Sequence, residues 1–155
     1  MPSLATSEQL KKLYNYDPET GELTRKTYCG RGYPGQVIKS DLISINYRKV
    51  NKPRVIWCIY YGKWPPEDQI VDHKDRDHSN DRINNLRLAS KIQNSHNVDY
   101  RPYQGTYFVA PDSWGARINI DGKRTHLGCF KTIDEAAEAY RKAAKETRGE
   151  FVCHL

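Results

Sequence analysis

Cysteine is sparse in this sequence of 155 residues, and no two cysteines are spaced as a metal-binding pair. Cys29, Cys58, Cys129 and Cys153 lie far apart without a Cys-x-x-Cys motif, which argues against a zinc ribbon. Long apolar runs are also missing. No stretch approaches the length of a transmembrane helix, and no apolar stretch follows a basic start as in a secretory signal. We therefore expect an intracellular protein with reduced thiols.

The composition predicts two small modules rather than one large hydrophobic core. Hydrophobic residues make up 37% of the chain, charged residues make up 28%, and the mean hydropathy is −0.85. The 11 Tyr and 3 Trp residues supply bulky apolar surface, so the chain differs from disordered sequences of similar polarity. Neither an internal repeat nor a low-complexity segment is visible. We expect modules over residues 1–97 and 104–155, joined by a linker over residues 98–103.

The net charge of +6 and the isoelectric point near 9.1 suggest a polyanionic partner such as nucleic acid. The excess of basic residues is spread over both modules, so it does not come from a basic tail. Because many soluble proteins are mildly basic, charge alone does not decide between a nucleic-acid-binding protein and others.

Periodicity and capping signals predict both helices and strands in the first module. A capping box of Ser90 and Gln93 predicts a helix that opens at Lys91. Pro53 and Gly62 flank an apolar run typical of a short buried helix. The expected elements are a helix over residues 4–14, strands over 22–25 and 42–50, a helix over 55–61, and a strand over 69–71.

The second module has the clearest local pattern in the chain. Apolar and polar residues alternate over residues 114–120, and Asp121-Gly122 then forms a two-residue hairpin signal. A second strand is expected up to about Phe130. Thr132 and Glu135 form a capping box before an amphipathic helix that ends at Gly149. These signals predict a small antiparallel sheet packed on one helix, and with the first module they predict the α+β class.

Residues 71–87 read VDHKDRDHSNDRINNLR, and Gln93-Asn94 follows on the next predicted helix. Together with the upstream segments 16–21, 54–57 and 62–65, this order of motifs resembles the HNH endonucleases of the phage and intron-homing type. The resemblance covers about residues 4–97 and implies a ββα-metal nuclease module. It also implies DNA as substrate and the cytoplasm of a bacterial host as the location.

The resemblance assigns a role to each residue of the motif. His73 would be the general base, because an imidazole titrates near neutral pH. Asp72 and Asn94 would hold one divalent metal ion, and Asn85 would complete the catalytic set by pinning the loop between strand and helix. Asn94 stands where many relatives have histidine, so hard oxygen ligands favour Mg²⁺, with Mn²⁺ possible, over zinc.

Ordinary structural interpretations of the same residues stay open. Asn85 can simply end a turn, and Asn94 can be an exposed helix residue. His78 and His96 lie nearby and can assist, although loop histidines are usually solvated. Pro53 stands where relatives have a histidine before Arg54.

Residues 104–155 resemble the AP2 domain, which occurs in plant transcription factors and fused to phage HNH nucleases. The segments that carry this resemblance are QGTY at 104–107, WGARI at 114–118, LGCF at 127–130, AAEAY at 136–140 and GEF at 149–151. The resemblance implies a three-stranded antiparallel sheet that lies in the major groove of DNA, backed by one helix. Much of the plant factors' base-reading set is absent here, so their sequence preference is not carried over.

The hairpin turn at Asp121-Gly122 fixes which residues share a face of that sheet. It pairs Asn119 with Arg124 and Arg117 with His126, and we expect these four residues on one polar face together with Gly115 and Gly128. Tyr107 on the first strand is expected to join them. This face suits contact with DNA, although a solvated sheet face would look the same.

These observations predict a metal-dependent DNA endonuclease that nicks or cleaves double-stranded DNA and is targeted by its second module. We expect a monomer that uses neither a membrane nor a small-molecule substrate. The main alternative is a catalytically weak or inactive regulator that docks on DNA through both modules. A structural RNA-binding protein would also be basic, but it would leave the HNH spacing unexplained.

Overall fold

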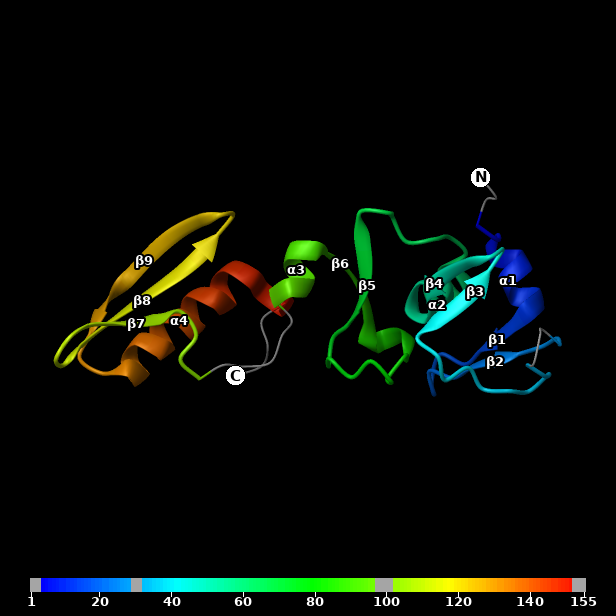
Figure 1. Cartoon of the computed structure of the whole chain (residues 1–155), viewed down its shortest axis with the longest axis horizontal. Helices are drawn as coiled ribbons and strands as arrows, with labels where there is room; N and C mark the ends of the chain where they lie inside the picture. The colour runs from blue at the N-terminus through cyan, green and yellow to red at the C-terminus, as the bar shows by residue number, and fades with distance from the viewer. Residues whose placement is uncertain (1–3, 29–31, 97–101, 152–155) are drawn as a thin grey trace. The chain divides into compact units, whose positions relative to one another are not determined.

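The computed structural model describes residues 4–28, 32–96 and 102–151. The chain divides into two compact units, Met1–Asn94 and Ser95–Leu155 (Figure 1). The predicted linker, residues 98–103, lies largely outside the described residues. No helix in the described ranges is long and apolar enough to cross a membrane.

The first unit alternates short helices with two-stranded antiparallel sheets. Its elements are α1 (Ser7–Leu13), β1 (Tyr14–Tyr16), β2 (Leu23–Arg25), β3 (Leu42–Ile45), β4 (Arg48–Asn51), α2 (Lys52–Tyr61), β5 (Gln69–His73), η1 (Ile83–Asn85), β6 (Leu86–Ser90) and α3 (Lys91–His96). The strand pairs are β1 with β2, β3 with β4, and β5 with β6.

Helix α1 begins at Ser7, three residues later than predicted, after a capping box at Thr6. Thr6 accepts a hydrogen bond from the Gln9 backbone, and the Gln9 side chain accepts one from the Thr6 backbone. Such a cap satisfies two donors at the helix start. The helix is shorter than the predicted 4–14, because Tyr14 already belongs to β1 and pairs with Arg25.

Helix α2 carries the core of the first unit. Val55, Ile56 and Cys58 are fully buried and pack in one cluster with Leu10 of α1 and Leu23 of β2. Burial raises the pKa of the Cys58 thiol to about 11, so it stays protonated at neutral pH. The helix ends at Gly62, whose φ of 77° is the left-handed conformation expected of a glycine cap.

Two strand predictions in this unit were wrong. The single strand expected over 42–50 is a hairpin, because Asn46 and Tyr47 both adopt positive φ and turn β3 back into β4. Strand β6 was not predicted, since residues 74–87 read as polar and turn-rich. It pairs with β5 along its whole length, from Gln69 opposite Ser90 to His73 opposite Leu86.

Strands β5 and β6 are followed directly by helix α3, whose residues Lys91–Asn94 belong to the first unit. The predicted capping box is present: the Gln93 backbone donates to the Ser90 hydroxyl oxygen, and the Ser90 backbone donates to the Gln93 side chain. The helix therefore opens at Lys91, immediately after β6. Asn94 is therefore the fourth residue of α3 and follows the end of β6 by four residues.

The second unit is a three-stranded antiparallel sheet in the order β7-β8-β9, with one long helix against it (Figure 1). Its elements are β7 (Thr106–Ala110), β8 (Ser113–Ile120), β9 (Lys123–Phe130), α4 (Ile133–Arg148) and η2 (Gly149–Phe151). The core joins Ile118 of the sheet with Tyr140 and Ala144 of α4. The predicted capping box of Thr132 and Glu135 starts the helix.

The register of the β8–β9 hairpin is as predicted near the turn and differs farther away. Arg117 pairs with His126 and Asn119 with Arg124. A bulge then inserts one extra residue, so Ala116 lies opposite Gly128 and Gly115 opposite Cys129. The expected place of Gly128 beside Gly115 on the polar face was therefore wrong. The α+β class is confirmed, with mixed helices and small antiparallel sheets.

Candidate active site

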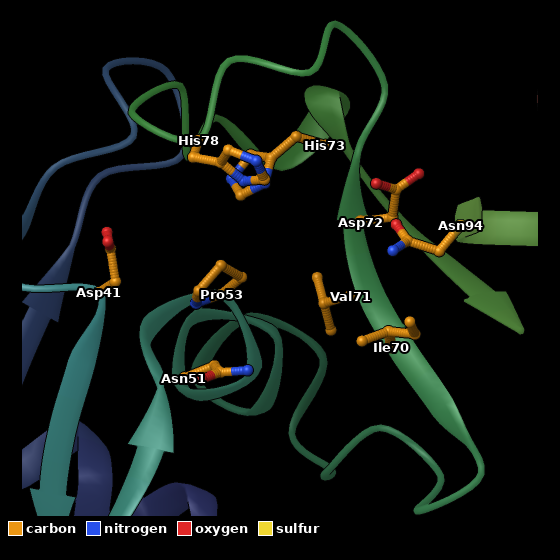
Figure 2. A pocket seen from close by; sticks show the side chains of 9 residues that line it. All are labelled: Asp41, Asn51, Pro53, Ile70, Val71, Asp72, His73, His78 and Asn94. Atoms are coloured by element: carbon orange, nitrogen blue, oxygen red, sulfur yellow. The ribbon is translucent and has the colours of Figure 1, made fainter. Parts of the chain in front are cut away.

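A pocket of about 400 Å³ opens at the end of β5 in the first unit (Figure 2). Strand β5 and helix α3 supply part of its lining, and the base of the β3–β4 hairpin supplies another part. Its lining residues are Asp41, Asn51, Pro53, Ile70, Val71, Asp72, His73, His78 and Asn94. The structure therefore brings three of the predicted site residues, Asp72, His73 and Asn94, to one cavity.

Asp72 is buried and carries a charge partner from the neighbouring strand. Its Oδ2 accepts a hydrogen bond from Arg87 Nε at 2.9 Å, and the two residues are directly opposite in the β5–β6 ladder. Each residue is only 7% exposed. A buried ion pair of this kind is held by its geometry, since either charge alone would be costly to bury.

His73 is also buried, and it contacts a second carboxylate. Its Nε2 lies 3.0 Å from Asp81 Oδ1, and the other oxygen of Asp81 lies 2.8 Å from Lys52 Nζ. The His78 ring stands edge-on to the His73 ring, with centroids 5.4 Å apart. The sequence motif assigned no role to Asp81, which lies within residues 71–87, or to Lys52 upstream of it, because their contact joins residues far apart in the chain and no spacing indicates it.

The Asn85 side chain makes three hydrogen bonds within the loop that joins β5 to β6. Its side-chain nitrogen donates to Asp75 Oδ1 and to the Asn80 carbonyl, both at 2.8 Å, and its side-chain oxygen accepts from the Asp75 backbone. Burial opposes ionisation of Asp75, but hydrogen bonds from Asn80 and Asn85 outweigh it and lower the Asp75 pKa. Asn85 does not line the pocket and acts on it through the loop.

The donor atoms in the pocket suit a hard divalent cation. Asp72 offers carboxylate oxygen and Asn94 offers amide oxygen, and such ligands are typical of Mg²⁺ and Mn²⁺ sites completed by water and phosphate. Among the described residues, no group of three or more His, Cys, Asp or Glu side chains could hold a metal by itself. Two protein oxygens therefore fit a cation that takes its other ligands from solvent and substrate.

The second unit presents a separate polar face. A shallow hollow of about 470 Å³ on it is lined by Tyr107, Val109, Arg117, Arg124, His126 and Cys129. The Tyr107 hydroxyl lies 3.0 Å from His126 Nδ1, and the Arg117 guanidinium lies 5.0 Å from the centre of the Tyr107 ring. Asn119 is exposed opposite Arg124. The five residues predicted for this face lie on neighbouring strands.

Gly115 allows this arrangement, because any side chain there would collide with the Tyr107 ring. The ring lies flat enough over β8 to contact both Arg117 and His126. Close approach of this kind is a common reason for glycine in a strand.

Comparison with known proteins supports the nuclease interpretation of the first unit. Residues 51–96 match the family model described as HNH endonuclease, and this segment contains Asp72, His73, Asn85 and Asn94. The chain is 30% identical over 128 residues to a protein of Acanthamoeba polyphaga mimivirus described as an uncharacterized HNH endonuclease. These matches support an HNH endonuclease domain within the chain.

The match to the viral protein covers 81% of this chain and 64% of the viral one. A shorter match of 46 residues is 46% identical to an AP2/ERF and B3 domain-containing transcription factor of Arabidopsis thaliana, and covers 30% of this chain and 14% of that protein. The chain thus spans less than two thirds of either relative. No solved structure matches the chain.

Proposed function

We propose that the protein is a metal-dependent DNA endonuclease that hydrolyses phosphodiester bonds in double-stranded DNA. The observation that carries this proposal is the meeting of Asp72, His73 and Asn94 in one pocket, inside the segment that matches HNH endonucleases. A carboxylate, an imidazole and an amide in one pocket provide a base and two hard ligands, which suit phosphodiester hydrolysis.

His73 acts as the general base in this proposal. It takes one proton from a water molecule whose oxygen forms a bond to phosphorus, while the bond from phosphorus to the 3′ oxygen breaks. The departing 3′ oxygen takes a proton from solvent, and the imidazolium later returns its proton to solvent. Asn85 belongs to the catalytic set by fixing the loop between β5 and β6.

Asp72 and Asn94 would hold one divalent cation, Mg²⁺ or Mn²⁺. When bound, such a cation supplies positive charge that stabilises the negative charge developing on the departing oxygen. The Arg87 side chain holds the Asp72 carboxylate in place through its hydrogen bond to Oδ2. The ligand Asp72 thus has a fixed position next to the base.

The second unit would bind a DNA groove through Tyr107, Arg117, Asn119, Arg124 and His126. Two arginines and an amide on a sheet face suit phosphate and base contacts. The short match to an AP2/ERF and B3 domain-containing transcription factor is in keeping with a DNA-binding role for part of this chain. We propose that this unit targets the nuclease, which acts as a monomer with one site per chain.

Supercoiled plasmid incubated with the full chain tests the proposal. We expect nicked or linear product with Mg²⁺ or Mn²⁺ and none with a chelator. Tight DNA binding without cleavage under any divalent cation would contradict the endonuclease assignment. It would instead support the alternative, a regulator that docks on DNA through both units.

A further inference from the structure

Three buried charged or polar side chains contact one another in a row that ends at His73, which lines the pocket. Lys52 Nζ lies 2.8 Å from Asp81 Oδ2, and Asp81 Oδ1 lies 3.0 Å from His73 Nε2. Each residue is less than a tenth exposed, and Asp81 is only 2% exposed. Burial of charges in a small unit costs several kcal/mol per ion unless partners compensate, so this arrangement calls for a reason beyond stability.

Lys52 stands where helix energetics disfavour it. It is the first residue of α2, where the positive end of the helix dipole repels a cation, and the first turn contains no acidic residue. Its backbone is fixed at the base of the neighbouring hairpin by donating to the Asp41 carbonyl at 2.7 Å. The local sequence therefore does not explain the lysine, whereas its contact with Asp81 does.

The backbone at Asp81 is clamped by residues 16–21, outside the segment that matches the HNH family. The Tyr16 hydroxyl donates to the Asp81 carbonyl at 2.7 Å, and Arg82 Nε donates to the Glu19 carbonyl at 2.7 Å. Gly21, with φ of +80°, packs so closely that a Cβ atom would lie 2.7 Å from the Arg82 nitrogen. These contacts fix the backbone from which the Asp81 carboxylate reaches His73.

The chemistry of the contact fixes the tautomer of the histidine. The Asp81 carboxylate, whose other oxygen pairs with Lys52, accepts a hydrogen bond from the ring, so the proton of the neutral His73 ring is on Nε2 and the lone pair is on Nδ1. The same carboxylate would stabilise the ring after it gains a second proton.

We propose that Asp81 and Lys52 are positioning residues that hold His73 as the Nε2-protonated tautomer and make Nδ1 the atom that accepts the proton from water. This inference rests on the proposed nuclease function, in which His73 is the base. Its structural part, control of the tautomer by Asp81, can be measured without cleavage.

The first test is nitrogen NMR of the full chain with labelled histidine, at about pH 8, where an ordinary histidine is neutral. The His73 signals are assigned from their absence in His73→Gln. We expect the Nε2-protonated pattern in the wild type and a mixture of tautomers in Asp81→Ala. An unchanged pattern in Asp81→Ala would overturn the proposal. If the wild type cleaves no DNA yet shows the expected pattern, the nuclease function fails and control of the tautomer stands.

The second test separates the cleavage rate from DNA affinity. Asp81→Asn presents an amide that can also donate to Nε2, which permits the wrong tautomer. We expect its single-turnover rate to fall by about 10-fold or more, as for other partners that orient a functional histidine. DNA affinity should change by less than about 3-fold. Asp68→Asn, at an exposed carboxylate before β5, is the matched control and should cleave like the wild type.

Lys52→Met leaves Asp81 buried without its cation and can unfold the unit. The double variant Lys52→Met with Asp81→Asn removes both charges and keeps the shape, so it tests the same point in a folded chain. We expect it to fold and to be as slow as Asp81→Asn. A rate within about 3-fold of the wild type in either Asp81→Asn or the double variant would refute positioning by these residues.

Discussion

Replacement of Arg87 by methionine tests how strongly the pocket depends on its buried ion pair. The change removes the hydrogen bond from Nε to Asp72 Oδ2 at 2.9 Å and leaves a carboxylate that is 7% exposed. Removal of one partner of such a pair costs about 3–5 kcal/mol, against about 0–1 kcal/mol for an exposed pair. Since a domain is stable by about 5–15 kcal/mol, the destabilisation should be large.

The assay is urea unfolding of the full chain, followed by tryptophan fluorescence. Trp57 and Trp64 belong to the first unit and Trp114 to the second, so a Trp114→Phe background restricts the signal to the unit that holds the pocket. We expect Arg87→Met to lower the free energy of unfolding by about 3–5 kcal/mol. The double variant with Asp72→Asn should recover much of this stability, because the buried carboxylate that Arg87 neutralised is then removed as well.

Divalent cations give this prediction a second part. If Asp72 is a metal ligand, millimolar Mg²⁺ binds the folded Arg87→Met variant and raises its unfolding midpoint. The double variant with Asp72→Asn should respond less. A destabilisation below about 1 kcal/mol in Arg87→Met would refute the reasoning, because the pair would then behave as an exposed one.

Three further predictions concern the metal, the loop between β5 and β6, and the polar face of the second unit. Asn94→Ala should shift the Mg²⁺ dependence of cleavage to higher concentration, with activity partly restored at saturation; an unchanged titration curve would exclude Asn94 as a ligand. The pKa of Asp75 in the folded loop lies below its ordinary value of 3.8, so ionised Asp75 stabilises the loop at any pH above 3.8. This stabilisation is lost as the pH falls through the lowered pKa. Protection of the loop amides from exchange, relative to the intrinsic rate at each pH, should therefore fall in acid below about pH 4, and this pH dependence should weaken in Asp75→Asn. Arg117→Ala with Arg124→Ala should reduce the slope of log affinity against log salt by about 0.9 for each phosphate that the variant no longer binds, whereas a slope equal to the wild type would mean that these arginines do not bind phosphates.

Local signals predicted much of the secondary structure because each acts over a few residues. The capping boxes at Ser90 and Thr132 start helices where expected. The turn at Asp121-Gly122 sets the pairing of Arg117 with His126. The bulge beyond that pair could not be predicted, because the turn sets the register only of the residues near it and nothing in the alternation of residues 123–130 marks an extra residue.

Other elements depend on contacts that a linear pattern does not carry. Asn46-Tyr47 lacks the glycine that usually marks a two-residue turn, so the hairpin looked like one strand. Strand β6 contains Arg87, which is polar in sequence and buried in the structure only because Asp72 lies opposite.

The motif predicted Asp72, His73 and Asn94 as neighbours, and they line one pocket. Lys52 and Asp81 come from α2 and from the loop after β5, and they meet only in the folded unit. The sequence contains no spacing that would connect them. Such charge partners can be found only by burial and distance, which require the three-dimensional structure.

The central claim is that His73 performs the chemistry while other residues bind DNA. Its most direct test is the single-turnover cleavage rate of His73→Ala beside the wild type at saturating Mg²⁺, with DNA affinity measured on the same samples. We predict a rate about 10²–10⁴-fold lower with nearly unchanged affinity. A variant that cuts within a few-fold of the wild type would contradict the assignment of His73 as the general base.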